Sequence, residues 1–263
     1  MCNAVLLAVD IGNTNIVAGV FSGDSLLAHW RLATEAHRMP DELAVLFRSL
    51  VQLDGLDGRG LKGAIVAGVV PSVQASVCEA IRRLWSIEPL VVSPRIDLGI
   101  HVEYNPPHGV GADRIANAVA AVKFYGAPVI VVDFGTGTNF DVIDHRGTYI
   151  GGAIAPGLEI AADALYARTA QLPHVPLEPP RRAIGQSTVE ALQSGILFGY
   201  AGLVDGLVER IGAALQGTPH VVATGGLGDV IGPLTRRVQD INPNLTLAGL
   251  QVIHQRNVPD ADG

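Results

Sequence analysis

The sequence predicts an α/β protein built from two similar halves. Three observations lead to this prediction. Apolar, strand-like runs alternate along the chain with segments of helical periodicity. An apolar run that ends in Asp-x-Gly occurs twice, at Asp10 and at Asp133. Of the 263 residues, 48% are hydrophobic and 16% are charged, so the chain can bury a large core and is not mainly disordered.

The two halves share an order of elements as well as a motif. Residues 6–15 read LLAVDIGNTN and residues 129–139 read VIVVDFGTGTN. A hairpin is expected after each, with strands at 16–21 and 26–32, then at 140–143 and 148–154. Two buried strands with chance turns could give Asp-x-Gly alone, but the shared order favours a duplication. We therefore predict two domains, 1–115 and 116–263, with a cleft between them.

The remaining elements alternate as an α/β fold requires. Helices are expected at 40–53, 73–85, 112–124 and 189–215, and strands at 64–70, 90–92 and 221–223. A further helix is expected after the glycine-rich run 151–157, which a ligand could approach closely or which could be an ordinary strand exit. Residues 172–185 contain four prolines and are expected to form a loop.

Charge and cysteine content exclude several functional classes. The net charge of −7 argues against non-specific nucleic-acid binding, which needs a basic face. Cys2 and Cys78 form no CxxC pair, so a disulfide framework or thiolate zinc site is not expected. The N-terminus lacks a signal peptide's basic region, and the apolar run 128–132 is too short to span a membrane. These features predict a soluble cytoplasmic protein with neither nucleic-acid nor membrane partners.

The two Asp-Gly turns are the candidate phosphate sites. Glycine, threonine and asparagine in such turns offer N–H and hydroxyl donors to phosphate oxygens, and the aspartate can hold a cation. No P-loop and no GxGxxG motif is present, and at Gly226 and Gly228 the third glycine is misplaced. Thr224, Gly225 and Gly226 could admit a nucleoside against bare backbone, or form an ordinary strand-to-helix turn.

A second candidate site precedes the expected helix 112–124. Gly109 and Gly111 loosen the chain, and Asp113 and Arg114 fall in the first helical turn. An aspartate there could act as a general base, and an arginine could grip a carboxylate with two hydrogen bonds. Alternatively, Asp113 complements the helix dipole and Arg114 pairs with a surface acid.

A stripe of four glycines marks the long helix expected at 189–215. Gly195, Gly199, Gly202 and Gly206 recur at helical spacing. Each costs about 1 kcal/mol relative to alanine, so the stripe indicates a closely packed face, against the domain's own sheet or against a second subunit. Thr188, just before the helix, could act as its N-cap.

Together these motifs resemble the type III pantothenate kinase family from about Leu6 to Asn257. The matching segments, in the family's order, are DIGNTN at 10–15, Tyr104, Pro107, GADR at 111–114, DFGT at 133–136, GGAIAPG at 151–157, LP at 172–173, IGQST at 184–188, QSG at 193–195 and ATGG at 223–226. The resemblance implies a fold of two duplicated actin-like (ribonuclease H-like) domains and an obligate homodimer. It also implies ATP-dependent phosphorylation of pantothenate to 4'-phosphopantothenate, the first step of coenzyme A biosynthesis.

The resemblance also assigns expected roles to residues. Asp113 resembles the acceptor of the pantothenate hydroxyl proton. Tyr104, Gly111, Ala112 and Arg114 look like substrate contacts, and Thr188 looks like one that reaches pantothenate near the subunit interface. The implied ATP-binding residues are Asp10, Ile11, Gly12, Asn13, Thr14, Asn15, Ile16, Val17, Thr136, Gly225 and Gly226. Asp10 is expected near magnesium, and Asp133 resembles the ligand of a monovalent cation, potassium or ammonium.

The second phosphate motif departs from the family. The family usually reads Gly-Thr-Ala-Thr-Thr where this chain has GTGTN at 135–139. Gly137 softens the turn, and Asn139 replaces a hydroxyl with an amide that can still donate and accept. The departure leaves a second hypothesis open, a non-catalytic regulatory relative. A third is another actin-like phosphotransferase, acting on a sugar or a carboxylate.

Overall fold

The computed structural model describes residues 5–106, 109–169 and 171–258, and the chain forms two compact units. The first unit contains the chain up to Ile100, then Tyr104–Ala120, and the chain from Leu245 onward. The second contains His101–Glu103 and Ala121–Asn244. The domains predicted at 1–115 and 116–263 follow the sequence repeat and stay a prediction, whereas the compact units follow contacts and include a return of the C-terminal segment to the first unit.

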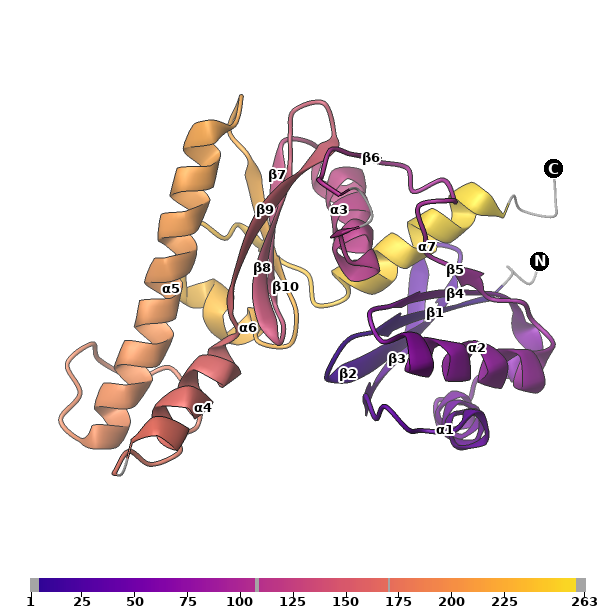
Figure 1. Ribbon diagram of the computed structural model, residues 1–263, viewed down its shortest axis with the longest axis horizontal. Coiled ribbons are helices and arrows are strands. Elements are labelled where there is room, and N and C mark those ends of the chain that lie inside the picture. The colour runs from indigo at the N-terminus through magenta and orange to yellow at the C-terminus, as the bar shows by residue number, and fades with distance from the viewer. Residues whose placement is uncertain (1–4, 107–108, 170, 259–263) are drawn as a thin grey trace. The chain divides into compact units, whose positions relative to one another are not determined.

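The first unit is built on a five-stranded sheet (Figure 1). Its elements are β1 (Val5–Ile11), β2 (Asn15–Ser22), β3 (Ser25–Ala33), α1 (Pro40–Leu53), η1 (Gly58–Gly60), β4 (Leu61–Gly68), α2 (Pro71–Trp85), β5 (Leu90–Val91) and α7 (Leu245–Asn257). The strand order is β3-β2-β1-β4-β5, with β1 antiparallel to β2 and parallel to β4. Helix α3 (Ala112–Tyr125) begins in this unit.

Helices cover both faces of this sheet. On one face, the side chains of Val9, Ile11 and Ile16 pack with Phe47 of α1 and Val77 of α2, all of them buried. On the other face lies α7 (Figure 1). It packs so closely that a Cβ added at Gly19 would lie 2.8 Å from Leu247 Cδ1. Asp97 pairs with Arg256 at 2.9 Å and fixes the end of α7.

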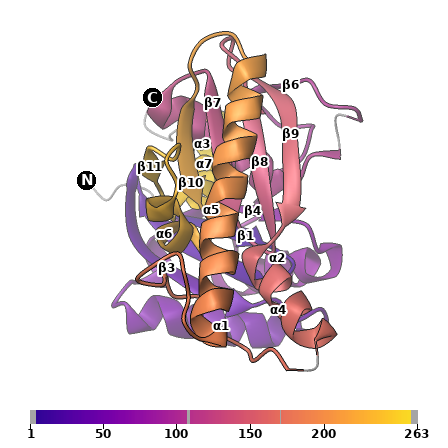
Figure 2. The ribbon, with the colours of Figure 1, turned by 90° about the vertical axis from the view of Figure 1, so that its left-hand side faces the viewer.

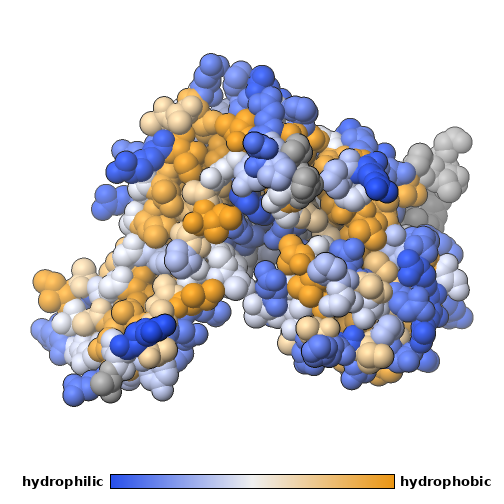
Figure 3. Space-filling view, viewed as in Figure 1, coloured by the Kyte–Doolittle hydropathy of each residue, from blue (hydrophilic) through white to orange (hydrophobic). Residues whose placement is uncertain are grey.

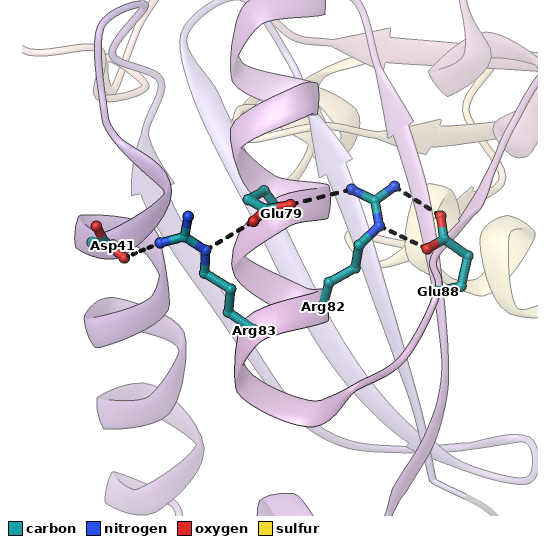
Figure 4. A network of polar contacts seen from close by, with 5 residues as sticks. All are labelled: Asp41, Glu79, Arg82, Arg83 and Glu88. Carbon is teal, nitrogen blue, oxygen red and sulfur yellow. Dashed lines mark hydrogen bonds and ion pairs between the residues drawn. The ribbon is translucent and has the colours of Figure 1, made fainter.

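An exposed network of ion pairs joins α1 and α2 (Figure 4). Arg83 donates to Asp41 of α1 at 2.6 Å and to Glu79 at 2.8 Å. Arg82 makes a two-pronged contact with Glu88, at 2.7 and 2.8 Å. This hydrogen bonding lowers the pKa of Glu88 below its ordinary value. These exposed ion pairs add to the contact between α1 and α2, whose buried faces are apolar.

The second unit repeats the topology of the first. Its elements are β6 (His101–Val102), β7 (Val129–Phe134), β8 (Gly137–Ile143), β9 (Thr148–Pro156), α4 (Leu158–Arg168), α5 (Thr188–Ala214), β10 (His220–Thr224), α6 (Gly228–Ile231), η3 (Gly232–Leu234) and β11 (Asp240–Ile241). The order β9-β8-β7-β10-β11 matches β3-β2-β1-β4-β5 strand for strand, and β6 adds to its edge. In both sheets the first two pairings are antiparallel and the next two are parallel. The predicted α/β repeat is therefore confirmed.

Helix α5 lies across the second sheet and has two distinct faces (Figure 2). Leu197, Ala201, Val204 and Val208 are buried toward the sheet. The four stripe glycines begin at Gly195, two positions earlier, and two positions turn a helix by about 200°. A Cβ added at any of them would meet nothing within 4 Å. The stripe therefore does not pack on the domain's own sheet, and of the two alternatives that the sequence left open this one is wrong.

By length and composition, α5 is also the one helix in the described ranges that could cross a membrane. Its most apolar window has a mean hydropathy of 1.3, and 33% of that window is buried. Helices that cover a core can pass the same test, and α5 contributes Leu197, Tyr200 and Val204 to the core of the second unit.

The expected elements are present with small shifts at their ends. The helix at 40–53 has the predicted bounds, and the hairpin strands that follow both Asp-Gly turns are two or three residues longer than expected. The proline-rich segment 172–185 is a loop. Several elements were not predicted, among them α7, the short edge strands β6 and β11, and the single-turn helices η1 and η3.

Candidate active site

The first Asp-Gly turn connects β1 to β2. Asp10 and Ile11 end β1, Asn15 begins β2, and Asn13 and Thr14 are exposed between them. The N–H of Gly12 donates to the carbonyl of Asn15 at 2.9 Å, which closes the turn. Such a turn presents backbone and side-chain donors at a strand end, where a phosphate group can be held.

A residue that the sequence analysis missed stabilises this turn. Thr34, directly after β3, donates its hydroxyl to the carbonyl of Gly12 at 2.8 Å, and its N–H donates to the carbonyl of Thr14 at 2.8 Å. The predicted hairpin strand ends at residue 32, and the position of Thr34 beside the turn depends on the strand register, in which Ala33 pairs with Asn15. Thr34 thus holds the shape of the turn from the neighbouring strand.

Asp113 lies in the first turn of α3, in the same unit as Asp10. One of its carboxylate oxygens, Oδ1, is buried and has no hydrogen-bond partner within residues 5–106, 109–169 and 171–258. That oxygen lies against Gly111, where an added Cβ would be only 2.3 Å away. The carbonyl of Gly111 accepts the first bond of the helix, from the N–H of Ile115 at 3.2 Å. Buried carboxylate oxygens normally have partners, so this one is available to an outside donor.

The same segment lies beside the end of β4. A Cβ at Gly111 would be 3.7 Å from Cγ1 of Val69, and the N–H of Val69 donates to the carbonyl of Ile11 at 3.0 Å. Val69 therefore bridges the segment that carries Asp113 and the strand that carries Asp10. Two predicted site segments, 10–17 and 111–114, are brought close to each other within the first unit.

Arg114 is not the surface residue that one alternative predicted. Its exposed fraction is 8%, so it is buried. Tyr104 is half-buried, and a Cβ at Gly109 would lie 3.5 Å from its ring. Ala112 is the first residue of α3. Pro107, part of the same predicted motif, lies outside the described residues.

The second Asp-Gly turn follows β7 in the second unit, as the first turn follows β1 in the first unit. Asp133 pairs with Thr224 of β10 on one side and with Asn139 of β8 on the other. Gly225 has a φ of +87°, and a Cβ there would lie 2.5 Å from Oδ1 of Asp133 and 2.7 Å from the backbone of Phe134. Only glycine fits this position, because a side chain would displace the carboxylate.

Thr136 and Gly226 are exposed at the rim of this turn. The carbonyl of Thr136 packs on Gly157, where an added Cβ would be 2.1 Å away. The glycine-rich run 151–157 therefore has a packing role at its last residue. Thr138 points the other way and shares a hydrogen bond of 3.2 Å with the hydroxyl of Tyr200 in the core.

The two aspartates suit hard cations that are held together with phosphate. No group of three or more His, Cys, Asp or Glu residues forms a metal cage within the described ranges. Magnesium in phosphate-transferring enzymes is commonly held by one or two carboxylates plus phosphate oxygens. The close support that Gly225 gives the Asp133 carboxylate fits an oxygen ligand kept in a fixed position.

Thr188 is exposed in the first turn of α5 and is not its cap. The N-cap is Ser187, whose hydroxyl accepts from the N–H of Glu190 at 3.2 Å. The predicted capping role of Thr188 is therefore wrong by one residue, and its hydroxyl is not used for capping.

Comparison with known proteins gives a consistent family. The family model described as type III pantothenate kinase matches residues 6–210. A type III pantothenate kinase of Moorella thermoacetica is 46% identical over 253 residues, covering 96% of this chain and 100% of the relative. One from Thermomicrobium roseum is 50% identical over 252 residues, covering 96% and 97%.

Solved structures with the same fold are far more distant in sequence. A Baf family transcriptional activator from Campylobacter jejuni has a TM-score of 0.55 at 18% identity, with 95% of this chain and 96% of that chain covered. An activator of 2-hydroxyisocaproyl-CoA dehydratase from Clostridium difficile, with bound ADPNP, has a TM-score of 0.56 at 13% identity, with 96% and 95% covered. These likenesses support the actin-like fold, and the sequence matches place this chain in the type III pantothenate kinase family.

Proposed function

We propose that this protein phosphorylates pantothenate at the expense of ATP, yielding 4'-phosphopantothenate for coenzyme A biosynthesis. The observation that carries the proposal is the buried Oδ1 of Asp113, which has no hydrogen-bond partner among the described residues and lies in the segment that resembles the family's substrate motif. Family membership supports the substrate, and the two Asp-Gly turns support the use of a nucleotide.

In this mechanism Asp113 orients the attacking hydroxyl of pantothenate and accepts its proton. Phosphoryl transfer passes through a loose transition state, so positioning matters more than early deprotonation. Arg114 holds the pantothenate carboxylate, for which a guanidinium offers two parallel donors. Tyr104, Gly111 and Ala112 complete the substrate contacts.

The proposed ATP-binding residues are 10–17 in the first unit and Thr136, Gly225 and Gly226 in the second. Asp10 would lie near magnesium, and Asp133 would hold a monovalent cation, potassium or ammonium. When bound, these cations neutralise charge on the phosphate groups. Glycine at 225 keeps the Asp133 carboxylate in place for this role.

The active form is a homodimer that uses the glycine face of α5. Four glycines meet open space there, although each costs about 1 kcal/mol in a helix. Beside them a pocket of about 330 Å³ runs between α4 and α5, lined mainly by apolar residues that include Leu165 and Leu203. Exposed Ile160 and Tyr166 extend this apolar surface, which Figure 3 shows in orange over α4 and α5. The exposed Thr188 lies on the same helix and contributes to the substrate site near the interface.

This function places the protein in the cytoplasm, without nucleic-acid or membrane partners. The net charge of −7 argues against nucleic-acid partners, which bind to a basic surface. The core contacts of α5 support reading it as a structural helix rather than a membrane span.

The substitution Asp113→Asn tests the proposal. It keeps the size of the side chain and removes the proton acceptor, so kcat should fall by about 100-fold or more. The affinity for ATP, measured by titration calorimetry, should change less than about threefold. Wild-type turnover in the variant would show that Asp113 does not accept the proton.

A substrate panel separates pantothenate from the remaining alternatives. ADP formation should be fastest with pantothenate and negligible with sugars or acetate. A faster sugar or acetate would mean that the protein is a different phosphotransferase of the same fold.

A further inference from the structure

A second pocket lies in the second unit, at the far end of β10 from Gly225. It holds about 370 Å³ and is lined by Val208 and Gly212 of α5, by Pro219 and Val221 at the start of β10, and by Arg236 and Arg237. A strand rises about 3.3 Å per residue, so Val221 and Gly225 are about 13 Å apart. The pocket is therefore separate from the turn that carries Asp133.

The loop that supplies the two arginines is tightly held. The carboxylate of Asp205 accepts the backbone N–H groups of Arg236 at 2.9 Å and Arg237 at 3.1 Å. The hydroxyl of Thr235 donates to the carbonyl of Gly232 at 2.8 Å, and the side-chain oxygen of Gln239 accepts from Val221 at 2.8 Å. The backbone beneath both guanidinium groups is fixed, which lowers the cost of ordering a ligand there.

The guanidinium groups of these arginines form few ion pairs in the described part of the chain. In the first unit, by contrast, the adjacent residues Arg82 and Arg83 form ion pairs with three carboxylates. At the pocket, Arg237 faces Glu209 at 3.4 Å, and in the described part of the chain no side chain pairs with the guanidinium of Arg236. The carboxylate of Asp205 accepts backbone N–H groups and, among the described residues, forms no ion pair with either guanidinium, although its charge remains near them. Two guanidinium groups over an apolar floor suit an anion with an apolar body.

We propose that this pocket binds a small organic anion, a phosphate monoester or a carboxylate carrying an apolar group. The anionic head contacts Arg236 and Arg237, and the apolar body lies against Val208, Pro219 and Val221. Glu209 competes with the ligand for Arg237. The proposal therefore predicts opposite effects of two substitutions. Removing the guanidinium of Arg236 weakens binding of the anion, and removing the carboxylate of Glu209 strengthens it.

The test uses phenyl phosphate as the probe, with the full chain in titration calorimetry. Arg236→Gln should weaken binding at least about tenfold, which corresponds to the loss of one charge-assisted contact. Glu209→Gln should tighten it by about threefold or more. Benzyl alcohol, which shares the ring but has no charge, should bind at least about tenfold more weakly than the probe. A parallel titration with benzoate distinguishes a phosphate-specific site from a general anion site, and dependence on Arg236 for either anion supports the proposal.

Matched variants control for net charge. Arg210→Gln removes one positive charge from α5 outside the lining, and Glu178→Gln removes one negative charge from an exposed loop. Both should leave probe affinity within twofold of wild type. Circular dichroism should show that Arg236→Gln is folded, because the guanidinium of Arg236 makes no ion pair with any residue that the structure describes. Binding that is equal in wild type and Arg236→Gln, or weaker in Glu209→Gln, would overturn the proposal.

Discussion

Asn139 lies directly opposite Asp133 in the antiparallel ladder between β7 and β8. Directly opposed residues in such a ladder have Cβ atoms about 4.5–5.5 Å apart on the same face of the sheet. The neighbouring Thr138 points into the core toward Tyr200, so the amide of Asn139 and the carboxylate of Asp133 share the other face. The residue that departs from the family pattern therefore lies beside the proposed cation ligand.

This relationship predicts an effect on cation dependence. Asn139→Ala removes an amide oxygen beside the Asp133 carboxylate, so the potassium concentration for half-maximal activity should rise by about threefold or more. Steady-state kinetics over a potassium series measures this. Gly137→Ala is the control, since a Cβ there meets only ordinary contacts of 3.6 Å or more. An unchanged potassium dependence in Asn139→Ala would show that the side chain of Asn139 does not contribute to binding of the cation.

The close approach of Gly225 to Asp133 predicts a stability effect. Gly225→Ala combines a positive φ with a backbone collision at 2.7 Å, so the free energy of unfolding should fall by about 2–4 kcal/mol. Gly126→Ala isolates the first cause, because Gly126 has a φ of +80° and nothing within 4 Å. Urea unfolding of both variants makes the comparison. Equal losses would mean that the contact with Asp133 and Phe134 is not restrictive.

The glycine face of α5 predicts an effect opposite to helix propensity. In an isolated subunit, Gly202→Ala would stabilise the helix by about 1 kcal/mol. If a second subunit packs there, the same change should weaken the dimer, and light scattering at micromolar concentration should reveal more of the 27.5 kDa species. Gly212→Ala, off this face, should leave the dimer intact. A chain that is monomeric as wild type would contradict the proposed dimer.

The ion pair between Arg82 and Glu88 predicts a dependence of stability on pH. Hydrogen bonds from Arg82 lower the pKa of Glu88 below 4.5 in the folded state. A lowered folded-state pKa stabilises the protein at pH values above the unfolded pKa, and the contribution is lost as pH falls through the folded pKa. The difference in unfolding free energy between wild type and Glu88→Gln should therefore be constant near neutral pH and should shrink below about pH 4.5.

Chemical denaturation at several pH values checks this expectation. Glu178→Gln serves as the matched variant, because in the described part of the chain Glu178 is exposed and forms no ion pair. If the difference in unfolding free energy between wild type and Glu88→Gln grew on acidification, it would contradict the lowered pKa of Glu88.

Much of the fold could be predicted because its signals are local. The apolar runs, Asp-Gly turns and hairpins of 6–32 and 129–154 recur in order, and the two sheets share a strand order as a result. Helix α7 was not predicted because it is buried on several sides. Leu245, Leu247, Leu250 and Ile253 are all buried, so no polar face gives a clear helical period. Its return to the first unit depends on contacts distant in sequence.

The sequence allowed the residues of the site to be predicted, but not their burial or their hydrogen-bond partners. Spacing placed Asp113 and Arg114 in a first helical turn, and two interpretations remained open. Burial of Arg114 and the unpartnered oxygen of Asp113 depend on packing around Gly111, which no local pattern encodes. The cap of α5 was misplaced because Ser187 and Thr188 are adjacent hydroxyl residues, and the helical phase decides which of them caps.

The most direct test of the central claim is ADP formation by the purified full-length chain with ATP, magnesium and pantothenate, in potassium and again in sodium. The account predicts turnover that needs pantothenate and that falls sharply when sodium replaces potassium. Absence of turnover from folded, dimeric protein would contradict the kinase assignment and would direct attention to Gly137 and Asn139 in a non-catalytic relative.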